Sequence, residues 1–141
     1  MNHPLTPFQS IALAFSGGGF RAAAFSLGVL SYLNKVKLTG DGGDTSLLSH
    51  VNFIASASGG TMTNLLYSSY LFKYKNEETA FRKCFAKLYA DMRGEHLLEE
   101  ATRILADSEY WEPAGITKQR NVINAFSKVY DKKLFAGETF D

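Results

Sequence analysis

The chain has 141 residues, 45% of them hydrophobic, which is enough for one domain with a sizeable core. Fifteen Lys and Arg residues against fourteen Asp and Glu residues leave a net charge of +1, so no excess of charge points to nucleic acid or another polyanion as a partner. The single cysteine, Cys84, excludes an internal disulfide framework and fits a reducing compartment.

The chain shows no targeting or membrane-spanning pattern. Its opening, MNHPLTPFQS, lacks the basic segment and apolar run of a secretion signal. No apolar run approaches the roughly 18 residues that span a bilayer. Three scattered histidines and one cysteine lack metal-ligand spacing, so we expect no metal and no cofactor. We therefore expect a cytoplasmic or peripheral membrane protein, and the oligomeric state stays open.

The first half of the chain predicts a βαβα unit with parallel strands. Ile11–Phe15 is a short apolar run that ends at glycines, as in a buried parallel strand. About Phe20–Lys35 predicts a helix whose apolar residues nearly encircle it, so we expect it to pack on more than one side. Val51–Ala55 predicts the second strand, and about Thr61–Tyr74 predicts the helix after it.

The rest of the chain predicts a loop and then helices only. Between the two strands, Thr39–Ser46 (TGDGGDTS) is rich in breaker residues and predicts a flexible surface loop. Helical spacing of apolar residues follows over three stretches, with a connector DSEYWEPAGITK before the third: Glu77–Met92, Glu95–Ala106 and Asn121–Tyr130. The fold class is therefore α/β, parallel strands followed by a mainly helical segment. Two strands make a poor sheet, so we expect the N-terminal piece of a larger domain.

A serine turn follows the second predicted strand, with the sequence Ser56-Ala57-Ser58-Gly59-Gly60. A serine hydroxyl becomes an effective nucleophile on a sharp strand-to-helix turn, where small neighbours permit strained backbone angles. Ser58 fits the G-x-S-x-G frame of such an elbow, with Ser56 in place of the first glycine. The helix N-terminus would add partial positive charge beside the developing oxyanion. The alternative, that Ser56 and Ser58 are ordinary N-cap residues, stays open.

A glycine loop, Gly17, Gly18 and Gly19, follows the first predicted strand. Consecutive glycines let backbone N–H groups turn toward one point and form an anion-binding nest. In an acyl hydrolase such a nest holds the tetrahedral oxyanion, and one donor is worth on the order of 10²–10³ in rate. Arg21 is positioned to support the loop or to attract an anionic head group. The segment also matches the dinucleotide fingerprint G-x-G-x-x-A, although no carboxylate ends the next strand.

The two sites together are more specific than either alone. FSGGGFRAAAFSLGVL resembles the G-G-G-x-R oxyanion segment of patatin-like phospholipases, and IASASGGT resembles their nucleophile elbow. The resemblance is strong over about Ile11–Leu66. It implies the N-terminal portion of a three-layer α/β/α domain. It also implies a lipid acyl ester hydrolase, a phospholipase or lysophospholipase.

The resemblance further implies a Ser-Asp dyad. Ser58 would attack the ester carbonyl, and the N–H groups around Gly18 and Gly19 would hold the oxyanion. An aspartate in a later D-G-G or D-G-A turn would be the base. No aspartate after Ser58 is followed by glycine, and Asp41–Gly43 spells the turn too early in the chain, so we interpret it as a surface loop. We expect the base beyond Asp141, and this chain alone to be inactive or nearly so.

The remaining candidates have simpler interpretations. His96 lies where a helix begins and is expected to be solvated or capping, and His50 precedes the second strand. Cys84 lies on an apolar helix face and is expected in the core. Several late basic residues predict a solvated face, with anionic lipid as the alternative: Lys118, Arg120, Lys128, Lys132 and Lys133.

The expected partners follow from these interpretations. They are a lipid or other acyl ester substrate, with peripheral contact to a membrane, and no nucleic acid. Two other functions stay open: a non-catalytic patatin-like binding module, and nucleotide binding at the glycine loop.

Overall fold

The computed structural model describes residues 7–40, 43–93, 96–111 and 119–137. The chain divides into two compact units, Met1–Ala86 and Lys87–Asp141. The division falls inside helix α3 (Glu77–Arg93). No helix within the described ranges has the length and apolar character needed to cross a membrane.

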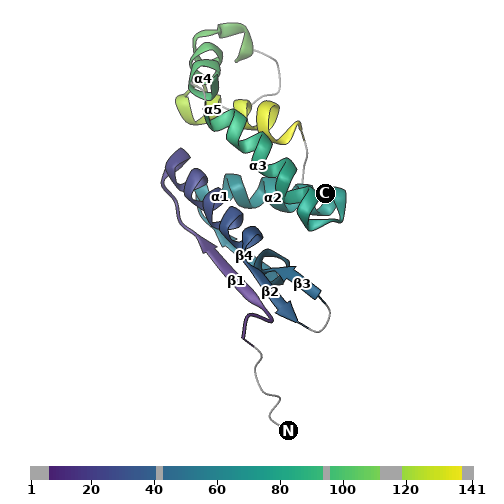
Figure 1. The fold of residues 1–141 in the computed structure, drawn as a ribbon. Coiled ribbons are helices and arrows are strands. Elements are labelled where there is room, and N and C mark those ends of the chain that lie inside the picture. Colours follow the sequence, from purple (N-terminus) through teal and green to yellow (C-terminus); the bar gives the residue numbers. More distant parts are fainter. Residues whose placement is uncertain (1–6, 41–42, 94–95, 112–118, 138–141) are drawn as a thin grey trace. The chain divides into compact units, whose positions relative to one another are not determined.

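The first unit is built around two parallel strands. Strand β1 (Ile11–Phe15) leads into helix α1 (Gly19–Lys35). Strand β4 (Val51–Ser56) pairs with β1 in parallel and is followed by helix α2 (Gly59–Tyr74). Figure 1 shows β1 and β4 side by side. The predicted α/β class and the parallel pairing are confirmed, and the helix and strand bounds agree within two residues.

A hairpin lies between α1 and β4, where the sequence predicts a flexible loop. Strand β2 (Lys37–Gly40) pairs antiparallel with β3 (Gly43–Ser46), and a 3₁₀ turn (Leu47–His50) leads into β4. The loop prediction for Thr39–Ser46 is therefore wrong over its described residues, Thr39, Gly40 and Gly43–Ser46. Glycine and polar residues have low strand propensity, but pairing with a neighbouring strand overrides it here. Asp41, from the early D-G-G turn, lies outside the described residues.

The sheet of β1 and β4 has one covered and one exposed face. The side chains toward α2 are buried or half-buried: Leu13, Phe15, Ile54 and Ser56. The opposite face carries exposed side chains, which are in register across the two strands: Ala12, Ala14, Phe53 and Ala55. The predicted burial of the first strand therefore holds for one face only, because no described element covers the other.

Helix α1 packs through one side. Its buried side chains include Ala23, Leu27 and Leu30. A fully buried hydrogen bond ties this side to α2, since the Thr63 hydroxyl donates to the Ala23 carbonyl at 2.9 Å. On the other side, Phe25 and Tyr32 are 73% and 66% exposed. The prediction that this helix packs on more than one side is wrong within the described residues, because nothing there covers these two rings.

The described secondary-structure elements of the second unit are all helical. Helix α4 (His96–Ala106) is followed by a 3₁₀ turn (Ser108–Tyr110), and α5 (Val122–Tyr130) continues into a π-helical segment (Asp131–Phe135). These bounds confirm the predicted helices, and His96 is the first residue of its helix as expected. Helices α4 and α5 share a buried cluster: Leu97, Ala101, Ile104, Ala125 and Val129.

Two of the late basic residues make hydrogen bonds to backbone carbonyl groups of the second unit. Lys128 is half-buried, lies over the rings of Tyr110 and Trp111, and donates to the Tyr110 carbonyl at 2.7 Å. The Arg120 guanidinium donates to two carbonyls at the C-terminal end of α4, at 2.7 and 2.9 Å. Carbonyl groups at a helix end lack intrahelical donors, so cations are favoured there. The solvated-face prediction is therefore wrong for Lys128, whereas Arg120 is exposed as predicted and in addition caps the end of α4.

Candidate active site

Ser58 occupies a sharp turn between β4 and α2, with backbone angles φ 47° and ψ −120°. A residue with a Cβ atom rarely adopts a positive φ, and such strain costs on the order of 1–3 kcal/mol. Ser58 stands at the N-cap position of α2 but makes no side-chain capping hydrogen bond. The N-cap interpretation therefore does not account for Ser58. The backbone strain instead presents an exposed serine side chain on a strand-to-helix turn.

The glycine loop lies directly beside this serine. A Cβ atom added at Gly17 would be 3.1 Å from the Ser58 Cβ and 3.7 Å from its Oγ. The strand register explains the proximity, because Phe15 pairs with Ser56 and both strands end at the same edge of the sheet. Loops that follow the carboxyl ends of neighbouring parallel strands meet at that edge. The two sites selected from the sequence are therefore one site in space.

Gly59 and Gly60 are positions where only glycine fits. A Cβ atom at Gly59 would overlap the Gly19 carbonyl group, with its carbon 2.7 Å away. A Cβ atom at Gly60 would lie 2.6 Å from the Phe15 Cβ and 2.8 Å from the Ser16 carbonyl oxygen. Distances under 3.0 Å force backbone movement, since the neighbours are themselves main-chain or Cβ atoms. These glycines let the start of α2 pack against the glycine loop.

Two helices begin at this site. Gly18, with φ 140°, is the N-cap residue of α1, and Gly19, with φ 61°, is its first residue. The Gly60 and Thr61 N–H groups of α2 bond to turn carbonyls at 3.1 and 2.9 Å. Gly59 lies between Ser58 and these two residues, at the first position of α2. The first N–H groups of a helix lack intrahelical acceptors, and helix N-termini carry partial positive charge. Negative charge beside Ser58 is therefore favoured by both helices.

Two side chains that the sequence analysis did not select hold this turn in place. Asn64 on α2 donates its amide hydrogens to the Ile54 carbonyl at 3.2 Å and to the Ser56 hydroxyl at 2.9 Å. Thr63 provides the buried link to α1 described above. The sequence carries only a weak signal for these two residues, because they are simply two neighbouring polar positions in a largely apolar helix. Ser56 thus contributes an acceptor that positions the elbow, in addition to its small size.

Arg21 lies exposed in the first turn of α1, two residues after Gly19. Its role at the loop or at a head group stays a prediction. The dinucleotide interpretation needs a carboxylate at the end of the next parallel strand, but β4 ends at Ser56 and continues into Ala57. The structure therefore provides no support for it.

Within the described residues, no hydrogen bond joins the Ser58 hydroxyl to an aspartate or a histidine. His50 pairs with the Thr45 hydroxyl at 3.0 Å, and Asp91 pairs with Lys87 at 2.6 Å. The general base therefore stays a prediction.

Two further features considered from the sequence are the single cysteine, Cys84, and a possible metal site. Cys84 is fully buried on α3, as predicted, and burial raises the pKa of its thiol to about 12. In the ranges that the structure describes, no three His, Cys, Asp or Glu side chains form a group able to hold a metal ion.

A glycine loop and a strained serine turn lie together at one edge of the parallel sheet. This arrangement is typical of α/β hydrolases that use a serine nucleophile. The comparison with protein families then names the family: the model described as Patatin-like phospholipase matches residues 13–139. The match covers most of the chain, which therefore belongs to the patatin-like phospholipase family, as the sequence motifs predicted. Membership of this family indicates a lipid hydrolase. No curated protein and no solved structure matches the chain.

Proposed function

We propose that the protein is a serine acyl hydrolase that cleaves lipid esters, acting as a phospholipase or lysophospholipase with Ser58 as the nucleophile. The observation that carries the proposal is the strained Ser58 backbone at φ 47°, with Gly17 beside the serine side chain and no capping bond to occupy the hydroxyl. A serine whose only role was to cap the helix would use its hydroxyl to do so.

The proposed chemistry uses backbone N–H groups of the glycine loop and the serine turn. The Ser58 Oγ attacks the ester carbonyl carbon, and its proton passes to the base while the carbonyl oxygen becomes negatively charged. The N–H groups of Gly18, Gly19 and Gly59 are the donors for that oxyanion, supported by the two helix N-termini. Collapse of the intermediate expels the protonated alcohol and leaves an acyl-serine, which water hydrolyses in the same way.

The base in this proposal is the aspartate of a Ser-Asp dyad, in a D-G-G or D-G-A turn beyond Asp141. A cytoplasmic or peripheral membrane location and contact with a lipid substrate belong to the same proposal. Arg21 is the residue proposed to support the glycine loop or attract an anionic head group.

The test is hydrolysis of a phospholipid and of a p-nitrophenyl ester by the full-length protein that contains this chain. Ser58→Ala should abolish release of fatty acid and labelling by a fluorophosphonate probe. Ser108→Ala, at an exposed serine of the second unit, is the matched control and should leave both unchanged. Unchanged turnover in Ser58→Ala would remove the serine assignment.

A second candidate is a non-catalytic patatin-like binding module. The observation in its favour is that no aspartate or histidine is bonded to the Ser58 hydroxyl among the described residues. Such a module would bind lipid but would neither release fatty acid nor react with the fluorophosphonate, and its lipid binding would survive Ser58→Ala.

A further inference from the structure

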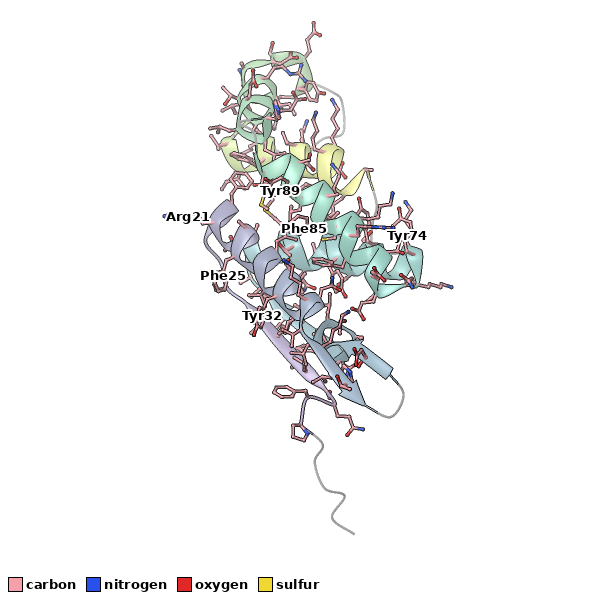
Figure 2. The ribbon with its side chains drawn as sticks, in the orientation of Figure 1. Arg21, Phe25, Tyr32, Tyr74, Phe85 and Tyr89 are labelled. Carbon is pink, nitrogen blue, oxygen red and sulfur yellow. The ribbon has the colours of Figure 1, made fainter. Side chains whose placement is uncertain are left out.

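One side of α1 carries a continuous exposed stripe. Its members, spaced three or four residues apart, are Arg21, Phe25, Gly28, Tyr32 and Lys35. Residues at this spacing lie on one helix face, and all five are exposed. In Figure 2, Arg21, Phe25 and Tyr32 lie along the same side of α1. We call these five residues the α1 stripe.

The α1 stripe combines large apolar area with positive charge. Phe25 is 73% and Tyr32 66% exposed, which leaves two aromatic rings in solvent between two basic ends. The 17-residue helix GFRAAAFSLGVLSYLNK contains no Asp or Glu, so nothing on α1 itself neutralises Arg21 or Lys35. Aromatic rings flanked by basic side chains match the chemistry of an anionic bilayer surface, where rings enter the head-group region and cations meet phosphate.

The charge pattern argues against a second copy of this chain as the occupant. Antiparallel pairing of two α1 stripes would bring Arg21 opposite Lys35, and parallel pairing would bring each cation opposite itself. Like charges meet in both arrangements, which disfavours the pair. An anionic lipid surface has no such conflict.

The stripe also begins at the candidate active site. Arg21 lies two residues after Gly19, the residue whose carbonyl group lies against Gly59 beside the serine turn. We propose that the α1 stripe docks the protein on anionic phospholipid membranes. The choice of a lipid partner rests on the proposed function, but docking itself requires no hydrolysis.

The experiment is co-sedimentation of the full-length protein that contains this chain with vesicles of ether-linked phospholipids, which have no ester to cleave. Vesicles of phosphatidylcholine alone are compared with vesicles containing about 25% phosphatidylglycerol. We expect binding to the anionic vesicles only, weakened by raising NaCl to about 0.5 M. Phe25→Ser combined with Tyr32→Ser should weaken partitioning about tenfold or more, because two rings leave the interface. Lys35→Glu should weaken it about fivefold or more.

The matched control is Phe72→Ser, at a phenylalanine of α2 that is 82% exposed but lies outside the α1 stripe. It should bind like the parent chain, and circular dichroism should show unchanged helix content in every variant. Absence of binding, an equal loss in Phe72→Ser, or insensitivity to both stripe changes would overturn the proposal. So would light scattering that shows a dimer lost in the Phe25 and Tyr32 variant.

The same assay separates docking from catalysis. Ser58→Ala should bind the ether-lipid vesicles as tightly as the parent chain. If Ser58 proves not to be the nucleophile, vesicle binding by the variants of the α1 stripe still decides the docking proposal.

Discussion

The carbonyl group of Gly19 occupies the space that a side chain on Gly59 would need. The two residues belong to different strand-to-helix turns, and their backbones touch because the parallel strands before them end at the same sheet edge. The glycine loop and the serine turn therefore form one packed unit. A shift of either backbone moves the other.

The close packing at Gly59 and Gly60 predicts that even an alanine substitution lowers stability. Gly59→Ala and Gly60→Ala should each lower the free energy of unfolding by about 1–3 kcal/mol or more, because the added methyl meets main-chain atoms and the Phe15 Cβ. Urea denaturation followed by circular dichroism measures the change. Gly28→Ala is the control, since a Cβ there meets nothing within 4 Å and helix propensity favours alanine. Equal stability of Gly59→Ala and the parent chain would contradict the packing described.

The buried hydrogen bond between α1 and α2 predicts a loss of stability when its donor, the Thr63 hydroxyl, is removed. Thr63→Val keeps the shape of the side chain but removes the buried hydroxyl hydrogen bond to the Ala23 carbonyl, which should cost about 0.5–1.5 kcal/mol. Thr102→Val removes the same kind of bond, to the Leu98 carbonyl, at an exposed site of α4. That control should change stability by less than about 0.5 kcal/mol. Similar losses in both variants would mean that burial is not the cause.

The second unit should lose stability in acid through Glu100. A hydrogen bond from Arg103, together with Lys132 and Lys133, lowers the pKa of Glu100 from 4.5 to about 2. Because the folded pKa lies below the unfolded one, the stabilisation is present above about pH 4.5 and is lost as the pH falls toward 2. Glu100→Gln should therefore flatten the pH dependence of unfolding in that window.

Urea titrations at several pH values measure this effect. The parent and Glu100→Gln should differ at neutral pH and converge near pH 2. About 0.5 M salt should narrow the difference at neutral pH, since exposed charges are screened. Two parallel curves would show that Glu100 does not contribute.

The thiol of Cys84 should report on opening of the first unit. Burial raises its pKa to about 12, so the reactive thiolate is scarce at neutral pH and the thiol is shielded. Reaction with a disulfide reagent should therefore be slow in the folded chain and fast in urea. Ala86→Cys in a Cys84→Ala background, at an exposed position two residues later, should react at once. A fast reaction of native Cys84 would contradict its burial.

The strain at Ser58 predicts an increase in stability from losing the candidate nucleophile. Ser58→Gly relieves a positive φ that glycine adopts freely, which should raise the free energy of unfolding by about 1 kcal/mol. Ser58→Ala keeps the strain and should leave stability nearly unchanged. Thermal unfolding of the two variants side by side measures the difference. If both variants match the parent, the backbone angle carries no strain.

The sequence predicted most elements of the first unit because their signals are local. Ile11–Phe15 is apolar and ends at glycine, and the helices show clear periodicity. The hairpin was missed because strand pairing, and not propensity, stabilises Lys37–Gly40 and Gly43–Ser46. The exposure of Phe25 was missed for a related reason: an apolar residue predicts burial, but which side of a helix is covered depends on the rest of the fold.

The candidate site was predictable in its parts but not in its contacts. Parallel strands indicate that the loops after them lie at one edge, and the motifs mark which residues matter. The overlap between Gly59 and Gly19 depends on the strand register, which the sequence does not reveal. The bonds from Asn64 to the end of β4 depend on it in the same way.

The positive φ of Ser58 has a consequence for engineering this protein. Glycine is better suited to that backbone than serine, so a library screened only for heat resistance should be enriched in variants that have lost the hydroxyl. Such variants would be well folded and, on the function proposed here, inert toward esters. Stability and chemistry therefore have to be selected together at this position.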